Sequence, residues 1–326
     1  MENLNVAVVG ATGLVGRKIL EILEERNFPI KNLRAFASEK SAGKKLDFKN
    51  EKITVEKLDE NSFSDGDIDI ALFSAGGSVS EKYIPIAIEN KVKCVDNSSF
   101  FRMDENTPLV VPEINKNEID KDTMLIANPN CSTIQSVLAI KPIFDNFSIK
   151  RIVYNTYQAV SGGGEKALED LYNKTNKKWK YKIYNNVLPQ IDDFTENGYT
   201  KEELKMINET RKILGDENLK ITATTARVPV ENSHAISINI ELDRDFDLDE
   251  IKNLIKNQEG VVLMDDIEKE IYPLPTKATG HDEVYVGRIR RDYSLDYGIN
   301  LWCVADNIRK GAATNAVENA EILLEV

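Results

Sequence analysis

The cysteine in the polar stretch NPNCST is the residue of this chain best suited to nucleophilic chemistry. Cys131 follows a short apolar run and precedes the apolar-periodic segment 134–143, so it falls at or near the start of a helix. A helix N-terminus favours the thiolate, because its dipole and backbone N–H groups stabilise negative charge. The same N–H groups, with the Asn130 side chain, could stabilise an oxyanion on an attacked carbonyl. The alternative is a buried structural cysteine, which suits Cys94 and Cys303, each inside an apolar run.

Two histidines could serve as the proton partner that a thiol nucleophile needs. His234 begins an alternating run with apolar neighbours, so catalysis and buried packing both suit it. His281 lies in the loop-like stretch TGHD and is expected to be exposed. Arg227 precedes His234 by seven residues across a turn-like segment, and a hairpin there would bring both side chains into one site. The planar guanidinium suits bidentate binding of a carboxylate.

A glycine turn near the N-terminus has the character of a phosphate-binding loop. Gly10, Gly13 and Gly16 follow a short apolar strand and open a segment with apolar residues on one helical face. Glycines at such a turn let the backbone approach a pyrophosphate, whose charge then lies at the helix N-terminus. The spacing is GxxGxxG rather than the commoner GxGxxG, and a tight turn without a ligand is the alternative. Its place in a strand–helix–strand pattern favours the nucleotide site.

The end of the second expected strand bears on the choice of cofactor. NAD sites usually place Asp or Glu there to bind the ribose hydroxyls. Here the sequence ASEKSAGK offers Ser38, Ser41 and Lys40 to a 2′-phosphate, which favours NADP. Glu39 would serve NAD if it turned inward, and Lys40 is alternatively a solvated loop charge.

Length and charge limit the classes of partner. The 326 residues suit two domains better than one. A net charge of −12 without a basic block makes nucleic acid and membrane poor partners, so an anionic substrate would need a local cationic pocket. The three scattered cysteines and two histidines predict no metal site and fit a reducing cytosol. We expect neither a secretory leader in the first residues nor a membrane span.

Two patterns of elements follow one another along the chain. Short apolar strands alternate with helical segments at first, at residues 6–10, 33–37, 68–73, 92–95 and 125–127. Longer strands follow at residues 151–160, 221–230, 234–242, 283–290 and 299–304, with helices at 201–214 and 308–324. The sequence therefore predicts an α/β fold, with a Rossmann-type parallel sheet first and an α+β domain on a mixed or antiparallel sheet second. Segment 173–200 has no clear period, and its structure is left open.

Taken together, these residues resemble the aspartate-semialdehyde dehydrogenases. The likeness runs over nearly the whole chain and rests on the following pieces: GATGLVG, ASEKSAGK, NSSFFRMD with PLVVPEIN, NPNCST, TYQAVSGGG, TKEELKMINETRKIL, the Arg227-x6-His234 spacing, and DNIRKGAATNAVENAEI. The combination of NPNCST, the TYQAVSG segment and the Arg–His spacing is its most specific part. The resemblance implies an NADP-binding domain of residues 1–130 and 305–326 and a catalytic and dimerisation domain of residues 131–304.

The resemblance implies roles for individual residues at the reacting centre. Cys131 would be the nucleophile and His234 the general acid/base. Gln158, in TYQAVSG, would orient the substrate or the thioester. Arg227 would bind the α-carboxylate of the substrate, and Glu202 would meet its α-amino group.

Phosphate recognition is implied in the same way. Lys205 and Arg102 would hold the phosphate group. The choice of Glu202 rather than Glu203 for the amino group has physical support, because Glu202 and Lys205 are three residues apart and share a helix face. The alternatives are an exposed ion pair for Glu202 and Lys205 and a surface charge for Arg102.

The cofactor contacts implied by the resemblance extend the glycine turn. The pyrophosphate would lie against the turn residues Gly10, Thr12, Gly13, Leu14 and Val15. Lys40 and Ser41, beside Ser38, would read the 2′-phosphate, and lysine where many relatives have arginine would weaken the preference for NADP. Ser161 and Gly162 would contact the nicotinamide side. Asn307 would reach the cofactor from the start of the last helix, which would pack back onto the nucleotide domain.

The implied activity is the reduction of L-4-aspartyl phosphate by NADPH to L-aspartate 4-semialdehyde and phosphate, through a thioester on Cys131. The resemblance places this reaction in the cytoplasm, in the biosynthesis of lysine, threonine and methionine, and implies a homodimer formed through the second domain. The nearest rival is N-acetyl-glutamyl-phosphate reductase, whose substrate has an acylated amine and no use for Glu202. A catalytically silent NADP-binding homologue is the rival from another class.

Overall fold

The structure is a computed structural model that describes residues 4–325 in two compact units. The nucleotide unit takes in the chain up to residue 129 and from residue 312 onward, and the catalytic unit comprises residues 130–311. Residues 305–311 thus lie with the catalytic unit, whereas the sequence predicts them with the nucleotide domain. Residues 1–3, on which the expectation of no secretory leader partly rests, lie outside the described residues. Within residues 4–325, no helix is both long and apolar enough to cross a membrane.

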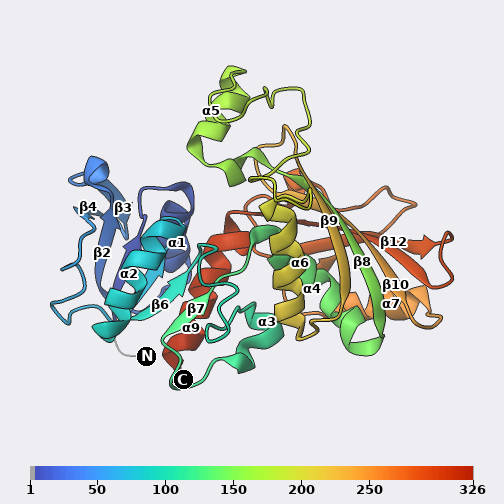
Figure 1. Ribbon diagram of the computed structural model, residues 1–326, viewed down its shortest axis with the longest axis horizontal. Coiled ribbons are helices and arrows are strands. Elements are labelled where there is room, and N and C mark those ends of the chain that lie inside the picture. The colour runs from blue at the N-terminus through green and yellow to red at the C-terminus, as the bar shows by residue number, and fades with distance from the viewer. Residues whose placement is uncertain (1–3, 326) are drawn as a thin grey trace. The chain divides into compact units, whose positions relative to one another are not determined.

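The nucleotide unit is built on a seven-stranded sheet with the order β3-β4-β2-β1-β5-β6-β7, parallel except for the β3–β4 pair. Its strands are β1 (Leu4–Val9), β2 (Ile30–Ala37), β3 (Lys45–Phe48), β4 (Glu51–Lys57), β5 (Ile70–Phe73), β6 (Lys93–Asp96) and β7 (Leu125–Ala127). Its longer helices are α1 (Leu14–Glu25), α2 (Gly77–Glu89) and α9 (Thr314–Glu325) (Figure 1). The Rossmann-type parallel sheet predicted from the sequence is confirmed.

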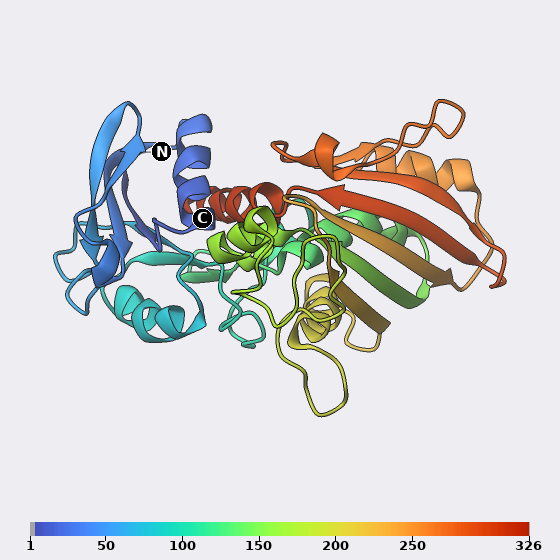
Figure 2. The same ribbon diagram turned by 90° about the horizontal axis from the view of Figure 1, so that it is seen from above.

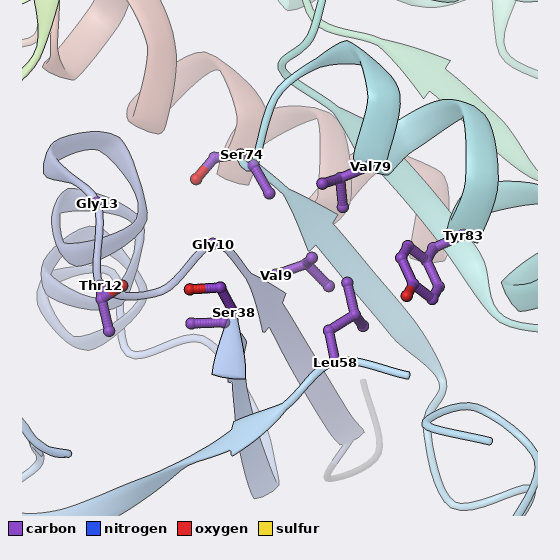
Figure 3. Close-up of a pocket in the computed structure, with 11 residues that line it drawn as sticks. Val9, Gly10, Thr12, Gly13, Ser38, Leu58, Ser74, Val79 and Tyr83 are labelled. Carbon is purple, nitrogen blue, oxygen red and sulfur yellow. The ribbon is translucent and has the colours of Figure 1, made fainter. Parts of the chain in front are cut away.

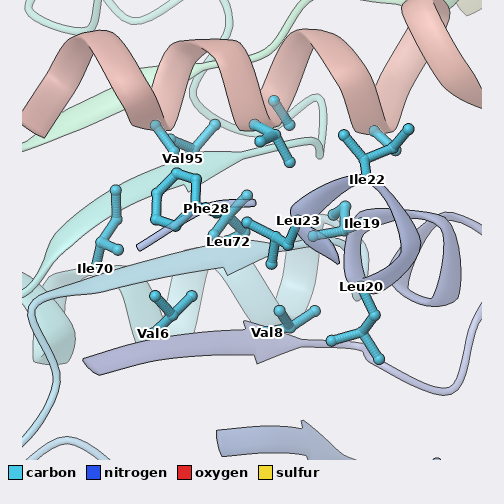
Figure 4. Close-up of a cluster of buried hydrophobic side chains, with 14 of the residues drawn as sticks. Val6, Val8, Ile19, Leu20, Ile22, Leu23, Phe28, Ile70, Leu72 and Val95 are labelled. Atoms are coloured by element: carbon cyan, nitrogen blue, oxygen red, sulfur yellow. The ribbon is translucent and has the colours of Figure 1, made fainter. Parts of the chain in front are cut away.

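Both faces of this sheet are covered, because alternate residues of its central strands point to opposite sides. On one face, the apolar stripe of α1 packs on strand residues such as Val6, Val8 and Leu72, and α9 adds Ala316 and Val317 (Figure 4). On the other face, a second cluster includes Val9, Phe36, Phe63, Phe73 and Ile84. Burial on both faces explains why these strands read as continuous apolar runs in the sequence.

Glycine is required at two positions of the first turn. Gly10 has φ +85°, and a Cβ added there would lie 2.7 Å from the carbonyl oxygen of Ser74. A Cβ on Gly16 would lie 2.2 Å from the carbonyl oxygen of Gly10, so this glycine lets α1 pack closely against the turn. The glycine spacing therefore serves close packing of strand, turn and helix.

The catalytic unit is built on a six-stranded mixed sheet with the order β11-β12-β13-β10-β8-β9. Its strands are β8 (Ile149–Gln158), β9 (Lys220–Arg227), β10 (His234–Leu242), β11 (Val261–Leu263), β12 (Val284–Asp292) and β13 (Gly298–Ala305). Its helices are α4 (Cys131–Asn146), α5 (Glu165–Asn173), α6 (Lys201–Leu214), α7 (Leu248–Lys256) and the short α8 (Pro275–Ala278). The strands lie side by side in both views (Figure 1, Figure 2). The mixed sheet predicted for the second domain is confirmed.

The predicted hairpin between the strands that carry Arg227 and His234 is wrong. β8 lies between β9 and β10, parallel to β9 and antiparallel to β10. The connection instead crosses the end of β8, where the backbone N–H of Val160 donates to the carbonyl of Val230. Six connecting residues are enough to pass one intervening strand, since neighbouring strands lie only about 5 Å apart.

Several elements differ from the sequence prediction. The tail is not one helix, because a π-helical turn, Arg309–Ala313, precedes α9. The elements that were not predicted include the strands β3, β4 and β11 and the helices α2, α5 and α7. Segment 174–200 contains no helix or strand, and Figure 1 shows it as an irregular excursion after α5.

Candidate active site

Cys131 is the first residue of α4, and Asn130 is the N-cap of that helix. The Asn130 Oδ1 accepts hydrogen bonds from the backbone N–H groups of Ser132 (2.9 Å) and Thr133 (3.3 Å). The start of the helix at Cys131 agrees with the sequence. The cap uses the N–H groups of Ser132 and Thr133, and the Asn130 Nδ2 donates to Glu202, whereas the stabilisation of an oxyanion at this helix start stays a prediction.

The three cysteines differ in burial. Cys94 and Cys303 are fully buried, whereas Cys131 is partly exposed. Burial raises the pKa of the Cys94 thiol far above its ordinary value, and burial raises the pKa of Cys303 to about 12. Both of these thiols are therefore protonated at neutral pH. Cys131 is left as the cysteine that combines access with a helix start.

Three neighbouring strands bring His234, Gln158 and Arg227 together. Gln158 pairs with Arg227 at the ends of the parallel strands β8 and β9. His234 begins β10 beside the same end of β8, since Ala235 lies opposite Tyr157. All three side chains are buried on the helix-covered face of the sheet. The strand β8, which lies between β9 and β10, thus takes the place of the predicted hairpin in bringing Arg227 and His234 together.

His234 is held as a neutral ring whose Nε2 points into the site. Its Nδ1 accepts a 3.0 Å hydrogen bond from the backbone N–H of Ala159, so the neutral ring carries its proton on Nε2. The Nε2 atom is buried and has no hydrogen-bond partner. Burial, assisted by the charge of Arg227, lowers the pKa of His234 well below its ordinary value. Of the two alternatives that the sequence left open for His234, buried packing is observed, and catalysis stays a prediction. His281 is exposed, as predicted.

This burial predicts a loss of stability on the acid side. The unfolded chain binds a proton at His234 near pH 6.5, and the folded protein binds it only at lower pH. The free energy of unfolding should therefore fall as the pH drops below 6.5, by up to ~1.4 kcal/mol per pH unit. Urea denaturation between pH 7 and 5 measures this slope, and His234→Gln should reduce it. Equal slopes in the two proteins would contradict the expectation.

Arg227 is a buried cation whose guanidinium keeps an unused hydrogen-bond donor. Its Nη1 donates to the carbonyl of Ala159 (2.6 Å), and its buried Nε has no hydrogen-bond partner. Burial lowers the pKa of Arg227, and the charges of Glu202 and Cys131 partly offset this. The indole of Trp179 lies 5.9 Å from the guanidinium carbon. A buried, partly unsatisfied guanidinium suits an anionic ligand.

Glu202 connects the other predicted substrate residues. Its Oε1 accepts hydrogen bonds from the Asn130 Nδ2 (2.9 Å) and the Gln158 Nε2 (3.1 Å). Its Oε2 lies 3.3 Å from the Lys205 Nζ. Only 7% of the Glu202 side chain is exposed, so the alternative of a surface ion pair does not hold. Glu203, by contrast, closes a capping box with Thr200 and faces away from this network.

Arg102 lies in the nucleotide unit and is buried rather than a surface charge. Its Nε donates to the carbonyl of Asn128 and its Nη2 to the carbonyl of Asn97, both at 2.9 Å. These contacts fix the guanidinium just beyond the carboxyl ends of β6 and β7. Lys205 belongs to the catalytic unit, so the two predicted phosphate residues come from different units.

A pocket of about 430 Å³ lies at the glycine turn of the nucleotide unit (Figure 3). It is lined by the predicted residues Gly10, Thr12, Gly13 and Ser38. Leu14 and Val15 begin α1 behind the turn and do not line it. Sequence reasoning missed other lining residues, which come from the ends of β4 and β5 and from α2: Leu58, Ser74, Ala75, Val79 and Tyr83. The stretch SAGG after β5 was the sequence signal that could have pointed to this part of the pocket.

The residues after β2 bear on the choice of cofactor. Glu39 is 79% exposed and pairs with the Lys57 Nζ at 3.3 Å, so it does not turn inward. Ser41 lies within 3.5 Å of the Thr12 hydroxyl, beside the glycine turn. Lys40 is exposed in the short helix Glu39–Ser41.

Ser161, Gly162 and Asn307 lie together in the catalytic unit. The Asn307 Nδ2 donates to the Ser161 hydroxyl at 2.9 Å, and its Oδ1 accepts from the backbone N–H of Ser233. Gly162 is so close to the site that an added Cβ would lie 2.9 Å from the Arg227 Nη1 and 3.5 Å from the His234 Nε2.

Gly162→Ala should therefore damage the site without unfolding the protein. The new methyl group displaces the Arg227 guanidinium, and we expect kcat/KM to fall by about 10- to 100-fold. Steady-state kinetics measure the loss, and a melting temperature within a few degrees of the wild type shows that the fold persists. Wild-type kinetics in this variant would mean that Gly162 does not border the reacting groups.

Comparison with known proteins agrees with this arrangement. Residues 5–122 match the family model "Semialdehyde dehydrogenase, NAD binding domain", and residues 140–310 match "Semialdehyde dehydrogenase, dimerisation domain". The chain is 52% identical to the aspartate-semialdehyde dehydrogenase of Aquifex aeolicus, covering 98% of each chain. The chain belongs to the aspartate-semialdehyde dehydrogenase family.

Other members of the aspartate-semialdehyde dehydrogenase family extend the comparison. The Bacillus subtilis protein is 47% identical, over 98% of this chain and 97% of its own. The crystal structure of aspartate semialdehyde dehydrogenase II from Vibrio cholerae, complexed with ASA, is 43% identical and superposes with a TM-score of 0.94, covering 100% of this chain and 99% of that one. Membership makes the protein an oxidoreductase with a nicotinamide cofactor, as the sequence predicts.

Proposed function

We propose that the protein reduces L-4-aspartyl phosphate to L-aspartate 4-semialdehyde, with release of phosphate and oxidation of NADPH, in the cytoplasmic biosynthesis of lysine, threonine and methionine. The observation that carries the proposal is the buried constellation of Arg227, His234, Gln158 and Glu202 in the unit whose helix α4 begins with Cys131. The Vibrio cholerae relative binds ASA, which supports the substrate class.

The first step is acyl transfer to sulfur. The Cys131 thiolate attacks the acyl carbon of the substrate, the carbon–oxygen bond to phosphate breaks, and a thioester forms. Arg227 binds the α-carboxylate, and Glu202 accepts hydrogen bonds from the α-ammonium. Lys205 and Arg102 offset the charge of the departing phosphate. The local cations explain how a protein with net charge −12 takes an anionic substrate.

The second step breaks the thioester. Bound NADPH supplies the hydride for the thioester carbon. The carbonyl oxygen then carries negative charge, and the Nε2 proton of His234 is placed to stabilise it by a hydrogen bond. Collapse of the tetrahedral species expels the Cys131 thiolate and releases the aldehyde. The acid/base role that the resemblance implies for His234 stays part of the proposal, and it would need the doubly protonated ring, because a neutral ring that lost its Nε2 proton would be left as an imidazolate anion.

NADP is the proposed cofactor. The pocket at the glycine turn, which is lined by Gly10, Thr12 and Gly13, fits a dinucleotide pyrophosphate. The outward turn of Glu39 toward Lys57 removes the carboxylate that NAD would use, and Lys40 with Ser38 and Ser41 would hold the 2′-phosphate. Ser161, Gly162 and Asn307 would face the nicotinamide.

Steady-state assays decide between this activity and its rivals. We expect reduction of NADP by L-aspartate 4-semialdehyde only when phosphate is present, with a higher kcat/KM for NADP than for NAD. N-acetyl-glutamate semialdehyde should be a poor substrate, because its acylated amine cannot bind Glu202 as an ammonium. Activity on the acetylated aldehyde alone, or no turnover with either, would reject the proposal.

A homodimer through the catalytic unit is also proposed, in line with the dimerisation domain matched by residues 140–310. The sheet face opposite α4 and α6 carries Tyr157, 41% exposed, with its ring 5.5 Å from Trp302, and the short helix α8 packs on part of this face through Ala278. Asn155 lies on the same face.

We expect Asn155→Glu to weaken the dimer, because a charge on each copy would be buried at the interface. Asn253→Glu, on α7, should leave the dimer unchanged. Light scattering measures both; a monomeric wild type, or an Asn155→Glu protein as dimeric as the wild type, would oppose this interface.

A further inference from the structure

Lys205, the proposed phosphate ligand of the catalytic unit, lies between two carboxylates. Its Nζ is 2.8 Å from the Asp192 Oδ2 and 3.3 Å from the Glu202 Oε2. A phosphate that binds Lys205 must therefore compete with a carboxylate that is already there. Asp192 has no part in the chemistry described above.

The two carboxylates are held very differently. Glu202 is only 7% exposed, and its other oxygen accepts hydrogen bonds from Asn130 and Gln158. Asp192 is 33% exposed and comes from the irregular segment 174–200. Its other oxygen is bonded only locally, to the backbone N–H of Asp193. Of the two, Asp192 is the carboxylate that can leave Lys205 without breaking the substrate network.

The backbone near Asp192 is tied to the active site. Leu188 exchanges backbone hydrogen bonds with Arg227, and the backbone N–H of Lys201, the first residue of α6, donates to the carbonyl of Asp193. Asp192 itself has φ +68°, a left-handed conformation that Asp, Asn and Gly tolerate better than other residues. The segment is thus anchored on both sides of Asp192, so its carboxylate stays within reach of Lys205.

We propose that Asp192 is a displaceable carboxylate that occupies Lys205 in the absence of phosphate and competes with phosphate for it. The inference rests on the proposed role of Lys205. In the biosynthetic direction, return of Asp192 to Lys205 promotes release of the phosphate product. In the phosphorolytic direction, Asp192 weakens the binding of phosphate. Asp192 is a positioning residue, and its removal should make phosphate bind more tightly.

Asp192→Asn tests the proposal, because it removes the charge, keeps the shape and tolerates the left-handed backbone. We expect the KM for inorganic phosphate in the phosphorolytic direction to fall about two- to fivefold, the effect expected of a partly exposed ion pair. The KM for the aldehyde should stay unchanged. Inhibition of the biosynthetic direction by inorganic phosphate should strengthen by the same factor. Assays at low ionic strength avoid screening of the effect.

Two further variants make the test selective. Asp192→Gly removes the carboxylate and suits φ +68°, so it should lower the KM for phosphate in the same way even if the asparagine variant folds poorly. Asp193→Asn is the matched control, because it removes an equal charge from the next residue, which pairs with Lys201 rather than Lys205. It should leave the KM for phosphate unchanged.

The outcomes separate this inference from the proposed function. A KM for phosphate that rises or stays constant in both Asp192 variants overturns the inference, because Asp192 would then support Lys205 or have no effect on it. An equal fall in Asp193→Asn also overturns it, because the effect would be general electrostatics. If the proposed function fails instead, the wild-type protein itself shows no phosphate-dependent reduction of NADP.

Discussion

Cys131→Ala should reduce kcat/KM with L-aspartate 4-semialdehyde by at least about 10⁴-fold, because no other group can form the thioester. Cys131 is the partly exposed cysteine at the start of α4, whereas burial keeps the Cys94 and Cys303 thiols protonated. Steady-state kinetics with NADP and phosphate measure the loss. Cys131→Ser should be nearly as inactive, since an alkoxide is a poor leaving group when the aldehyde forms.

Cys303→Ala and Cys94→Ala are the matched controls. Each removes a buried thiol, so each should lower the melting temperature by a few degrees while the turnover of folded protein stays close to the wild type. The account of Cys131 would be contradicted by substantial turnover in Cys131→Ala, or by inactivation in a folded Cys94 or Cys303 variant.

Arg227→Lys should be the second most damaging change. The guanidinium is buried, donates to the Ala159 carbonyl through Nη1 and has a buried, unbonded Nε. Lysine keeps one charge but loses the planar fork that holds a carboxylate at two points. We expect kcat/KM for the aldehyde to fall by about 10²- to 10³-fold, corresponding to roughly 3–4 kcal/mol for a disrupted buried ionic contact. Most of the effect should lie in the KM for the aldehyde.

The control for Arg227 is Arg211→Lys on α6. Arg211, in the last turn of α6, is partly buried and donates to a backbone carbonyl, that of Leu219, whereas Glu202 lies in the first turn of this helix. Its replacement should leave the kinetics unchanged. If Arg227→Lys raises the KM for phosphate and leaves the KM for the aldehyde untouched, Arg227 does not bind the α-carboxylate.

The sequence predicted those elements whose local signals agree with their burial. The helix Lys201–Leu214 was predicted with its observed bounds, and the structure shows that a capping box at Thr200 and an αL glycine at position 215 enclose its amphipathic run. The strands β3 and β4 escaped prediction because they are polar and largely exposed, so they lack the apolar runs of the central strands.

The residue types of the site could be predicted from the sequence, but the strand order and the backbone contacts that position them could not. Arg227 and His234 were placed together for the wrong reason, because a pattern of two strands and a turn cannot reveal that β8 has been inserted between them. The hydrogen bond from the Ala159 N–H to His234 is a backbone contact across 75 residues and leaves no mark in the sequence. The capping role of Asn130 was readable, since asparagine directly before a helix is a preferred N-cap.

The central claim is that the reaction passes through an acyl group on Cys131, and mass spectrometry of the digested protein tests it most directly. The protein is mixed with L-4-aspartyl phosphate without NADPH, quenched in acid and digested. The account predicts a mass increase of one aspartyl group on the peptide that contains Cys131, lost when NADPH is added before the quench. A protein that is fully active when NADPH is supplied but forms no acyl adduct in its absence would contradict this claim, as would an adduct on Cys94 or Cys303 instead.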